Sequence, residues 1–213
     1  TAAAVSKGVE PPVNAPQPPV ARTAPHRLEA HGHVRIDDYF WLRERESPEV
    51  IAYLEAENDY TKAVMADTEA LQETLVEEIK GRIKQTDLSV PYKLQDYYYY
   101  VRYEEGKDYA IHCRKKGGLD APEEIMLDVN VLAEGHAYYA LGRVAVSSGQ
   151  DLVAYAVDTE GRRKYTVYFK DLASGALLPD ILPDVTGNMA WANDNKTLFY
   201  AKQDPDTLRW HQI

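Results

Sequence analysis

The apolar residues between positions 47 and 84 recur with the spacing of an α-helix. Four of them stand four residues apart, with Glu and Lys between them: Leu71, Leu75, Ile79 and Ile83. This spacing places them along one face of an amphipathic helix. Ser47 and Pro48 suit the N-cap and the first helical position, and the pattern is interrupted at Asp67. The chain therefore predicts two successive helices, over residues 48–66 and 68–84.

After Pro91 the pattern changes to short apolar runs separated by turn residues. Residues 97–101 read Tyr-Tyr-Tyr-Tyr-Val, a polar turn follows, and residues 109–113 return as Tyr-Ala-Ile-His-Cys. Strands rich in Tyr, Val and Ile and bounded by such turns are typical of antiparallel hairpins. The same pattern recurs on either side of Gly161, which predicts a second hairpin.

An internal repeat favours one β architecture over another. Residues 145–156 and residues 190–201 each read as strand, polar turn and strand, and they stand 45 positions apart without a gap. Two further pairs share an offset of 55 positions: Tyr100 with Tyr155, and Gly106 with Gly161. A period near 45 residues with several short strands per unit is typical of a β-propeller. A β-sandwich is the alternative, because its strands also come about every 8–12 residues.

These patterns divide the chain into three expected parts. Residues 1–25 form an Ala- and Pro-rich tail that has little to bury, so we expect it to be disordered. Residues 26–86 form a loop and a helical segment. Residues 87–213 supply roughly two and a half blades, whereas a propeller needs at least about four. We therefore expect an α+β chain segment with N-terminal helices followed by the first, incomplete blades of a β-propeller.

Composition and charge narrow the class of function. Hydrophobic residues make up 45% of the chain, which is enough for a sizeable core. The net charge of −10 argues against binding to nucleic acids or anionic membranes. No apolar run approaches the ~18 residues of a membrane helix. Cys113 is the only cysteine, which excludes an internal disulfide and fits a reducing compartment such as the cytoplasm, with the periplasm as the alternative.

The candidate catalytic and metal-binding residues favour structural interpretations. A nucleophile elbow requires Gly-x-Ser-x-Gly, and no such run occurs in the 213 residues. The serines expected in turns are therefore not interpreted as nucleophiles: Ser147, Ser148 and Ser174. His31 and His33 offer two imidazoles, but a loop pair without a third ligand is typical of polar surface. We expect no catalytic residue, no metal site and no cofactor in this chain.

Several other residues have two interpretations. For Asp37 and Asp38 an acid/base pair is less favoured than capping of the following turn or pairing with an arginine. Trp41 and Leu42 are expected to anchor the helical segment, and Cys113 to be a buried thiol. Residues 97–100 alternate faces, so two tyrosines can pack inward and two can face solvent. Arg162 and Arg163 follow a predicted hairpin turn, where they are either a solvated loop or one side of an interdomain ion pair.

A longer series of motifs resembles one peptidase family. Residues 31–43 read His-Gly-His-Val-Arg-Ile-Asp-Asp-Tyr-Phe-Trp-Leu-Arg, similar to the opening signature of the prolyl oligopeptidase family. Further segments resemble its oligopeptidase B group: residues 53–58, 64–66, 78–83 and 191–194. The resemblance covers residues 20–213 almost continuously. One departure is Val-Ser-Ser-Gly at residues 146–149, where the family usually has Ser-Pro-Asp-Gly.

The resemblance implies an architecture and an activity. In this family a seven-bladed propeller caps an α/β-hydrolase domain that carries Ser, Asp and His, and the N-terminal helices pack on that domain. Oligopeptidase B cleaves short peptides after Arg or Lys. The resemblance thus implies that this chain, which has none of the hydrolase domain, gates access for short basic peptides. The alternatives are a prolyl-specific member and a non-catalytic propeller that binds peptides or proteins. Residues 85–91 are expected to form one interdomain hinge.

Overall fold

A computed structural model describes residues 16–213, and the chain divides into two compact units, Thr1–Ile83 and Lys84–Ile213. Each unit is described by itself. Most of the expected tail, residues 1–15, lies outside the described residues. Residues 16–25 contain no helix or strand.

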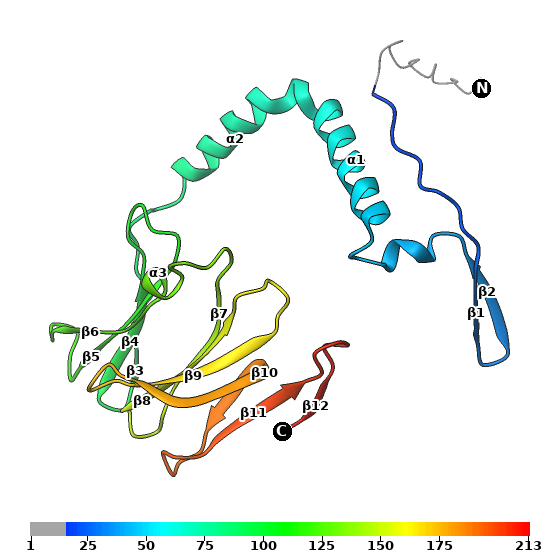
Figure 1. Ribbon diagram of the computed structural model, residues 1–213. Helices are drawn as coiled ribbons and strands as arrows, with labels where there is room; N and C mark the ends of the chain where they lie inside the picture. Colours follow the sequence, from blue (N-terminus) through cyan, green and yellow to red (C-terminus); the bar gives the residue numbers. More distant parts are fainter. Residues whose placement is uncertain (1–15) are drawn as a thin grey trace, which may run out of the picture. The chain divides into compact units, whose positions relative to one another are not determined.

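The first unit consists of a hairpin followed by helices (Figure 1). Its elements are β1 (His26–Ala30), β2 (His33–Asp37), η1 (Phe40–Arg43), α1 (Pro48–Met65), η2 (Ala66–Thr68) and α2 (Glu69–Gly81). The break predicted near Asp67 is the short 3-10 turn between α1 and α2, so the two predicted helices are confirmed. Pro48 occupies the start of α1, although the Ser47 side chain makes no capping hydrogen bond.

The segment before β1 is bonded to the first helix. The Arg22 guanidinium donates to both carboxylate oxygens of Glu49, at 2.6 and 2.9 Å, and lies 5.0 Å from the centre of the Trp41 ring. Trp41 Nε1 donates to the Arg22 carbonyl at 2.9 Å, and the Trp41 ring meets Tyr53 of α1 edge to face. The expected tail therefore has ordered partners from Arg22 onward, three residues before its expected end.

The apolar stripe of α2 lies exposed within its unit. Leu71, Leu75 and Ile79 of α2 are 58%, 45% and 60% exposed, and Ile83, two residues past the end of the helix, is 58% exposed. Fully burying one such side chain stabilises a protein by about 1.5–3 kcal/mol. These four side chains together therefore form a large exposed apolar surface on the helical segment.

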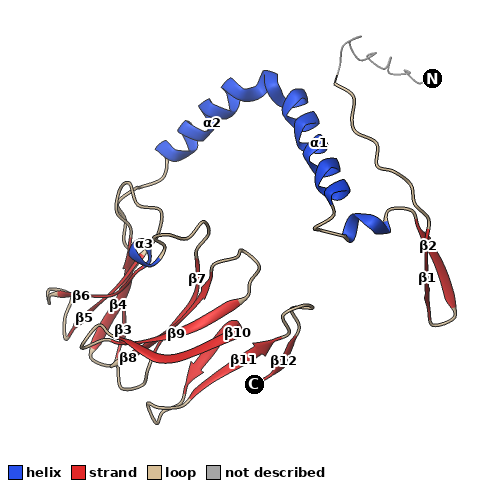
Figure 2. Ribbon diagram, in the orientation of Figure 1, coloured by secondary structure: helices blue, strands red, loops and turns tan. Residues whose placement is uncertain are grey.

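The second unit is built almost entirely from antiparallel strands (Figure 2). The first sheet has the order β3-β4-β5-β6, from β3 (Tyr92–Leu94), β4 (Tyr97–Arg102), β5 (Ile111–Lys116) and β6 (Glu123–Asp128). A short helix, α3 (Val129–Leu132), follows. The second sheet runs in sequence order from β7 (Ala140–Val146), β8 (Leu152–Asp158) and β9 (Tyr165–Asp171) to β10 (Leu177–Trp191), β11 (Leu198–Gln203) and β12 (Trp210–Gln212).

The long strand β10 divides the second sheet into two blades. Its first half pairs with β9 and its second half pairs with β11, with a register shift between Val185 and Met189. The described blades are therefore β3–β6, then β7–β9 with the first half of β10, then the second half of β10 with β11 and β12. The 45-residue repeat falls on the turns β7–β8 and β10–β11, which confirms the propeller interpretation over the sandwich.

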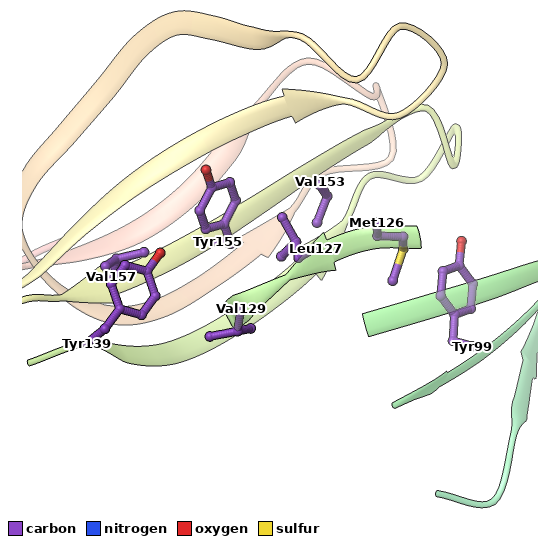
Figure 3. Close-up of a cluster of buried hydrophobic side chains, with 8 residues drawn as sticks. All are labelled: Tyr99, Met126, Leu127, Val129, Tyr139, Val153, Tyr155 and Val157. Carbon is purple, nitrogen blue, oxygen red and sulfur yellow. The ribbon is translucent and has the colours of Figure 1, made fainter. Parts of the chain in front are cut away.

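Strand β8 forms the centre of the core because it is buried on both faces. Val153, Tyr155 and Val157 point to one face, where they meet residues that end the first blade, Met126 and Leu127 among them (Figure 3). The intervening alanines of β8 face the other way, into a cluster with residues of the third blade. The alternation of a strand thus allows the second blade to pack against both neighbours.

Candidate functional site

The turns that join the first two strands of each blade are hydrogen-bonded to one another. Gln95 Nε2 donates to the Ser148 carbonyl at 3.0 Å, which links the first blade to the second. Ser148 Oγ donates to the Ala192 carbonyl at 3.3 Å, and the Gly149 amide donates to Asn195 Oδ1 at 2.6 Å. These bonds form a continuous inner rim across the three described blades.

The three turns share one unusual backbone position. Gln95, Gln150 and Asn195 have φ values of 53°, 64° and 60°. They stand 55 and 45 positions apart, which are the two offsets of the internal repeat. Positive φ is uncommon outside glycine, although asparagine tolerates it better than most residues. The same turn conformation therefore recurs in each blade of the inner rim. The offsets of the internal repeat predict its positions, although they do not predict the hydrogen bonds between the turns.

Asp151 and Ser147 fix the central turn of the rim. Asp151 accepts from Ser147 Oγ at 2.9 Å and from Asn195 Nδ2 at 2.9 Å, and these bonds, the one from Asn195 foremost, lower the pKa of its carboxyl. Ser147 Oγ in turn accepts from the Leu152 amide at 3.1 Å. Ser147 is buried, and no histidine contacts it among these bonds. Its hydroxyl thus stabilises the turn through these two bonds.

Arg114 connects the first blade to the same turn. Its side chain is 5% exposed, and Nη1 donates to the Gln150 carbonyl at 2.5 Å. Nε donates to Glu124 at 2.7 Å, and the guanidinium lies 4.1 Å from the centre of the Tyr97 ring. Nothing in the sequence pattern indicated this role, because an arginine in a strand usually faces water.

The tyrosine run of β4 packs on both faces. The Tyr99 hydroxyl donates to Gln150 Oε1 on the side of the second blade, and burial raises the pKa of Tyr99. The Tyr100 hydroxyl donates to Glu123 at 2.6 Å on the opposite side, where burial and this bond raise its pKa. The prediction that two of these tyrosines face solvent was wrong: all four are buried or half-buried. Arg102 and Glu123 form an ion pair at 3.0 Å on the second face.

A cavity of about 830 Å³ lies within the second unit, between the first blade and β7. Its wall includes the inner strands of both blades and the turn between β4 and β5. Six tyrosines line that wall: Tyr92, Tyr99, Tyr100, Tyr103, Tyr109 and Tyr139. Pockets of this size that combine apolar walls with a few polar groups are typical ligand sites.

The other candidate residues of the first unit lie apart from any catalytic arrangement. His31 occupies the two-residue turn between β1 and β2, and His33 begins β2. Within residues 16–213 no group of three or more His, Cys, Asp or Glu side chains is arranged to hold a metal ion. Asp37 Oδ1 accepts from the Tyr39 amide at 3.0 Å, and Asp37 lies 3.6 Å from Arg35. The capping and pairing role predicted for Asp37 is confirmed.

Cys113 is fully buried in β5, which confirms the prediction of a buried thiol. Burial raises its pKa to about 12, so the thiolate is scarce at neutral pH. Among the described residues no helix is long and apolar enough to cross a bilayer.

Arg162 and Arg163 lie at the tip of the β8–β9 hairpin, where both are exposed. The buried Asp158 holds this tip by accepting from three backbone amides, of which the Arg163 amide is the nearest at 2.6 Å. Neither guanidinium forms an ion pair with any residue of the described part of the chain. Two adjacent cations are thus presented on a rigid turn.

The segment between α2 and the first blade is only partly free. The Asp87 carbonyl accepts from the Tyr103 amide at 2.7 Å, and the Ser89 amide donates to the Val101 carbonyl at 2.8 Å. These bonds extend the first sheet past its edge. Residues 87–89 are therefore bonded to β4, and the hinge over residues 85–91 stays a prediction. The short stretch before them, residues 84–86, makes no backbone hydrogen bond of this kind.

Comparison with known proteins matches residues 18–213 to the family described as prolyl oligopeptidase, N-terminal beta-propeller domain. The chain is 46% identical over 209 residues to dipeptidyl aminopeptidase BI of Pseudoxanthomonas mexicana, a match that covers 90% of this chain and 29% of that protein. It is 36% identical over 193 residues to protease 2 of Moraxella lacunata, covering 87% of this chain and 28% of the relative.

A solved structure gives the same match in three dimensions. Oligopeptidase B from Leishmania major superposes with a TM-score of 0.83 at 34% identity, over 92% of this chain and 30% of that one. The chain thus spans less than a third of the length of these relatives. The match includes the helices as well as the blades, since it begins before β1.

Proposed function

Because this chain belongs to the prolyl oligopeptidase family, of which it forms an N-terminal propeller portion, we propose that the protein is a serine peptidase that hydrolyses short peptides after Arg or Lys. Within it, residues 1–213 admit substrates and do not cleave them. The observation that carries this proposal is the likeness to oligopeptidase B at 34% identity across both the helices and the blades. The lack of a nucleophile elbow in the 213 residues supports the division of labour.

A second activity has a specific observation in its favour. The relative with 46% identity carries the name of a dipeptidyl aminopeptidase, an enzyme named for releasing dipeptides. This identity exceeds the 34% shared with oligopeptidase B. Removal of dipeptides from the amino terminus is therefore the second candidate. Cleavage after proline and a purely binding role are the remaining alternatives.

Three fluorogenic substrates distinguish these activities in the full-length protein. We expect a blocked arginyl substrate to be cleaved much faster than a blocked prolyl substrate or an unblocked dipeptidyl substrate. A serine-directed phosphonate probe should label one serine, and peptide mapping should place that serine outside residues 1–213. Preference for the unblocked dipeptide would favour the second candidate. Absence of both labelling and hydrolysis would leave the propeller as a binding module.

We propose that access is controlled by movement between the two units of this chain. A propeller that covers a hydrolase site admits short flexible peptides and excludes folded proteins, so opening requires rotation about a few chain crossings. The segment joining α2 to the first blade is one such crossing. Because residues 87–89 are fixed to β4, rotation is absorbed by residues 84–86.

Stiffening this crossing should slow turnover without removing the nucleophile. Gln85→Pro and Thr86→Pro, made together in the full-length protein, fix two φ angles at positions whose amides make no backbone hydrogen bond. We expect kcat and KM to change together, while the serine probe still labels fully. The matched control is Gln85→Ala with Thr86→Ala, which removes the same side chains. Equal kinetics in both variants would place the hinge elsewhere.

The exposed features of the chain supply surfaces for a hydrolase domain. We propose that the apolar stripe that begins at Leu71 packs on that domain, because contact with a partner would bury its four half-exposed aliphatic side chains. Arg162 and Arg163 offer cations for carboxylates on the same partner. We place the protein in the cytoplasm, since its single cysteine requires no oxidising compartment, and the periplasm is the alternative.

A further inference from the structure

The cavity between the first blade and β7 has one acidic and one basic residue in its wall. These are Asp108, in the turn between β4 and β5, and Arg143, in β7. Neither side chain forms an ion pair or a hydrogen bond with any other residue in the described part of the chain. By contrast, the neighbouring Lys107 is paired with Glu104 at 2.7 Å. The cavity therefore carries a free negative and a free positive group on opposing elements.

Two further polar groups of the wall lack protein partners. Tyr139 is 7% exposed, and its hydroxyl makes no hydrogen bond within residues 16–213. His112 is half-buried and likewise unbonded, and burial lowers the pKa of its imidazole, which keeps the ring neutral at pH 7. Both groups can donate to or accept from a ligand in the cavity.

The rest of the wall is aromatic and aliphatic. Tyr92 and Tyr103 are 61% and 44% exposed, and they present their rings beside the aliphatic residues of β7. Tyrosine rings give large contact area with little loss of side-chain freedom. Such a wall can accommodate ligand side chains of varied shape.

We propose that this cavity binds a short peptide with both ends free, whose carboxylate pairs with Arg143 and whose ammonium pairs with Asp108. An arginine can hold a carboxylate through two parallel hydrogen bonds. A volume of 830 Å³ lies within the range of about 300–1,000 Å³ that is typical of small-molecule sites. Extended peptides span about 3.3–3.6 Å per residue, so di- to tetrapeptides fit this scale. The choice of a peptide rests on the proposed peptidase function, since such an enzyme generates these molecules.

Calorimetry on the full-length protein tests this site. The catalytic serine is first blocked with the phosphonate probe, and Ala-Tyr is titrated together with its C-terminal amide and its N-acetyl form. We expect Ala-Tyr to bind at one site per chain, and the amide and the N-acetyl form to bind more weakly. Arg143→Met should weaken the binding of Ala-Tyr by about tenfold, because the charge-assisted pairing with the carboxylate is lost, while binding of the amide stays unchanged. Asp108→Asn should likewise weaken the binding of Ala-Tyr, while binding of the N-acetyl form stays unchanged.

The control is Arg162→Met, which removes an exposed arginine outside the cavity. It should leave Ala-Tyr binding unchanged. Arg143 and Asp108 are both exposed, so the variants should keep the wild-type melting temperature. The proposal is overturned if Ala-Tyr does not bind at millimolar concentration, or if it binds equally to both cavity variants. Neither result bears on hydrolysis of the arginyl substrate by unblocked enzyme, which tests the peptidase function separately.

Discussion

Replacing Arg114 by methionine should lower the free energy of unfolding of the propeller by about 2–4 kcal/mol. The guanidinium is almost fully buried and donates to the Gln150 carbonyl and to Glu124. Methionine fills similar space but donates nothing, so the Gln150 carbonyl loses a charge-assisted bond. Glu124 is 43% exposed and can turn to water, which limits the loss on its side. The loss should be largest at the boundary between the first and second blades.

Hydrogen exchange in the full-length protein measures this loss of stability at the boundary between the first and second blades. The amides of residues 147–152 should exchange faster in Arg114→Met, and the melting temperature should fall. Arg209→Met is the control, because Arg209 is exposed in the turn before β12. Arg114→Lys should recover part of the protection, since lysine keeps the charge but has one donor nitrogen where arginine uses two. Unchanged exchange in the methionine variant would show that the packing of β8 alone holds these blades together.

The periodicity of the chain predicted most of its elements. The four-residue spacing that starts at Leu71 predicted α2, and the break at Asp67 predicted the boundary with α1. The 45-residue repeat predicted equivalent turns, because each blade buries its strands in the same manner. Local patterns therefore sufficed wherever a residue's environment depends on neighbours close in sequence.

These local patterns did not predict the contacts between blades. Arg114 donates to a carbonyl 36 positions away, and Gln95 donates to one 53 positions away. Nothing in the sequence distinguishes Arg114 or Gln95 from a polar residue that faces water. The solvent-facing tyrosines were predicted wrongly for the same reason, since the alternation of β4 does not reveal that both of its faces are covered. These contacts were missed because the residues that form them are far apart in the sequence, not because their residue types are unusual.

The cavity was unpredictable because segments far apart in the sequence form it. Asp108 lies in a turn, Arg143 in an inner strand, and Tyr139 just before that strand. Each alone is an ordinary polar or aromatic residue.

Replacing Gly142 by alanine should destabilise the second blade by about 1–3 kcal/mol through overpacking. Gly142 lies in β7 at a register shift between Leu141 and Val144. A Cβ atom placed there would stand 2.5 Å from Tyr165 Cε1, far inside van der Waals contact. The opposite edge of the ring faces Gly187 of β10, where a Cβ built on the backbone would lie 3.4 Å from it. Tyr165 thus lies between β7 and β10, and an added methyl group must displace the ring or one of the two strands.

The control for this change is Gly118→Ala, in the turn between β5 and β6. No atom lies within 4 Å of the added Cβ there, and φ is not positive. Alanine at such a position stabilises a protein by about 0.4–1 kcal/mol, since it restricts the unfolded chain. The two substitutions should therefore change the melting temperature in opposite directions. Adding Tyr165→Ala to Gly142→Ala removes the obstructing ring, so the double variant should lose less stability than the two single losses combined. Strict additivity would mean that the ring is free to move and that the glycine is not required for its size.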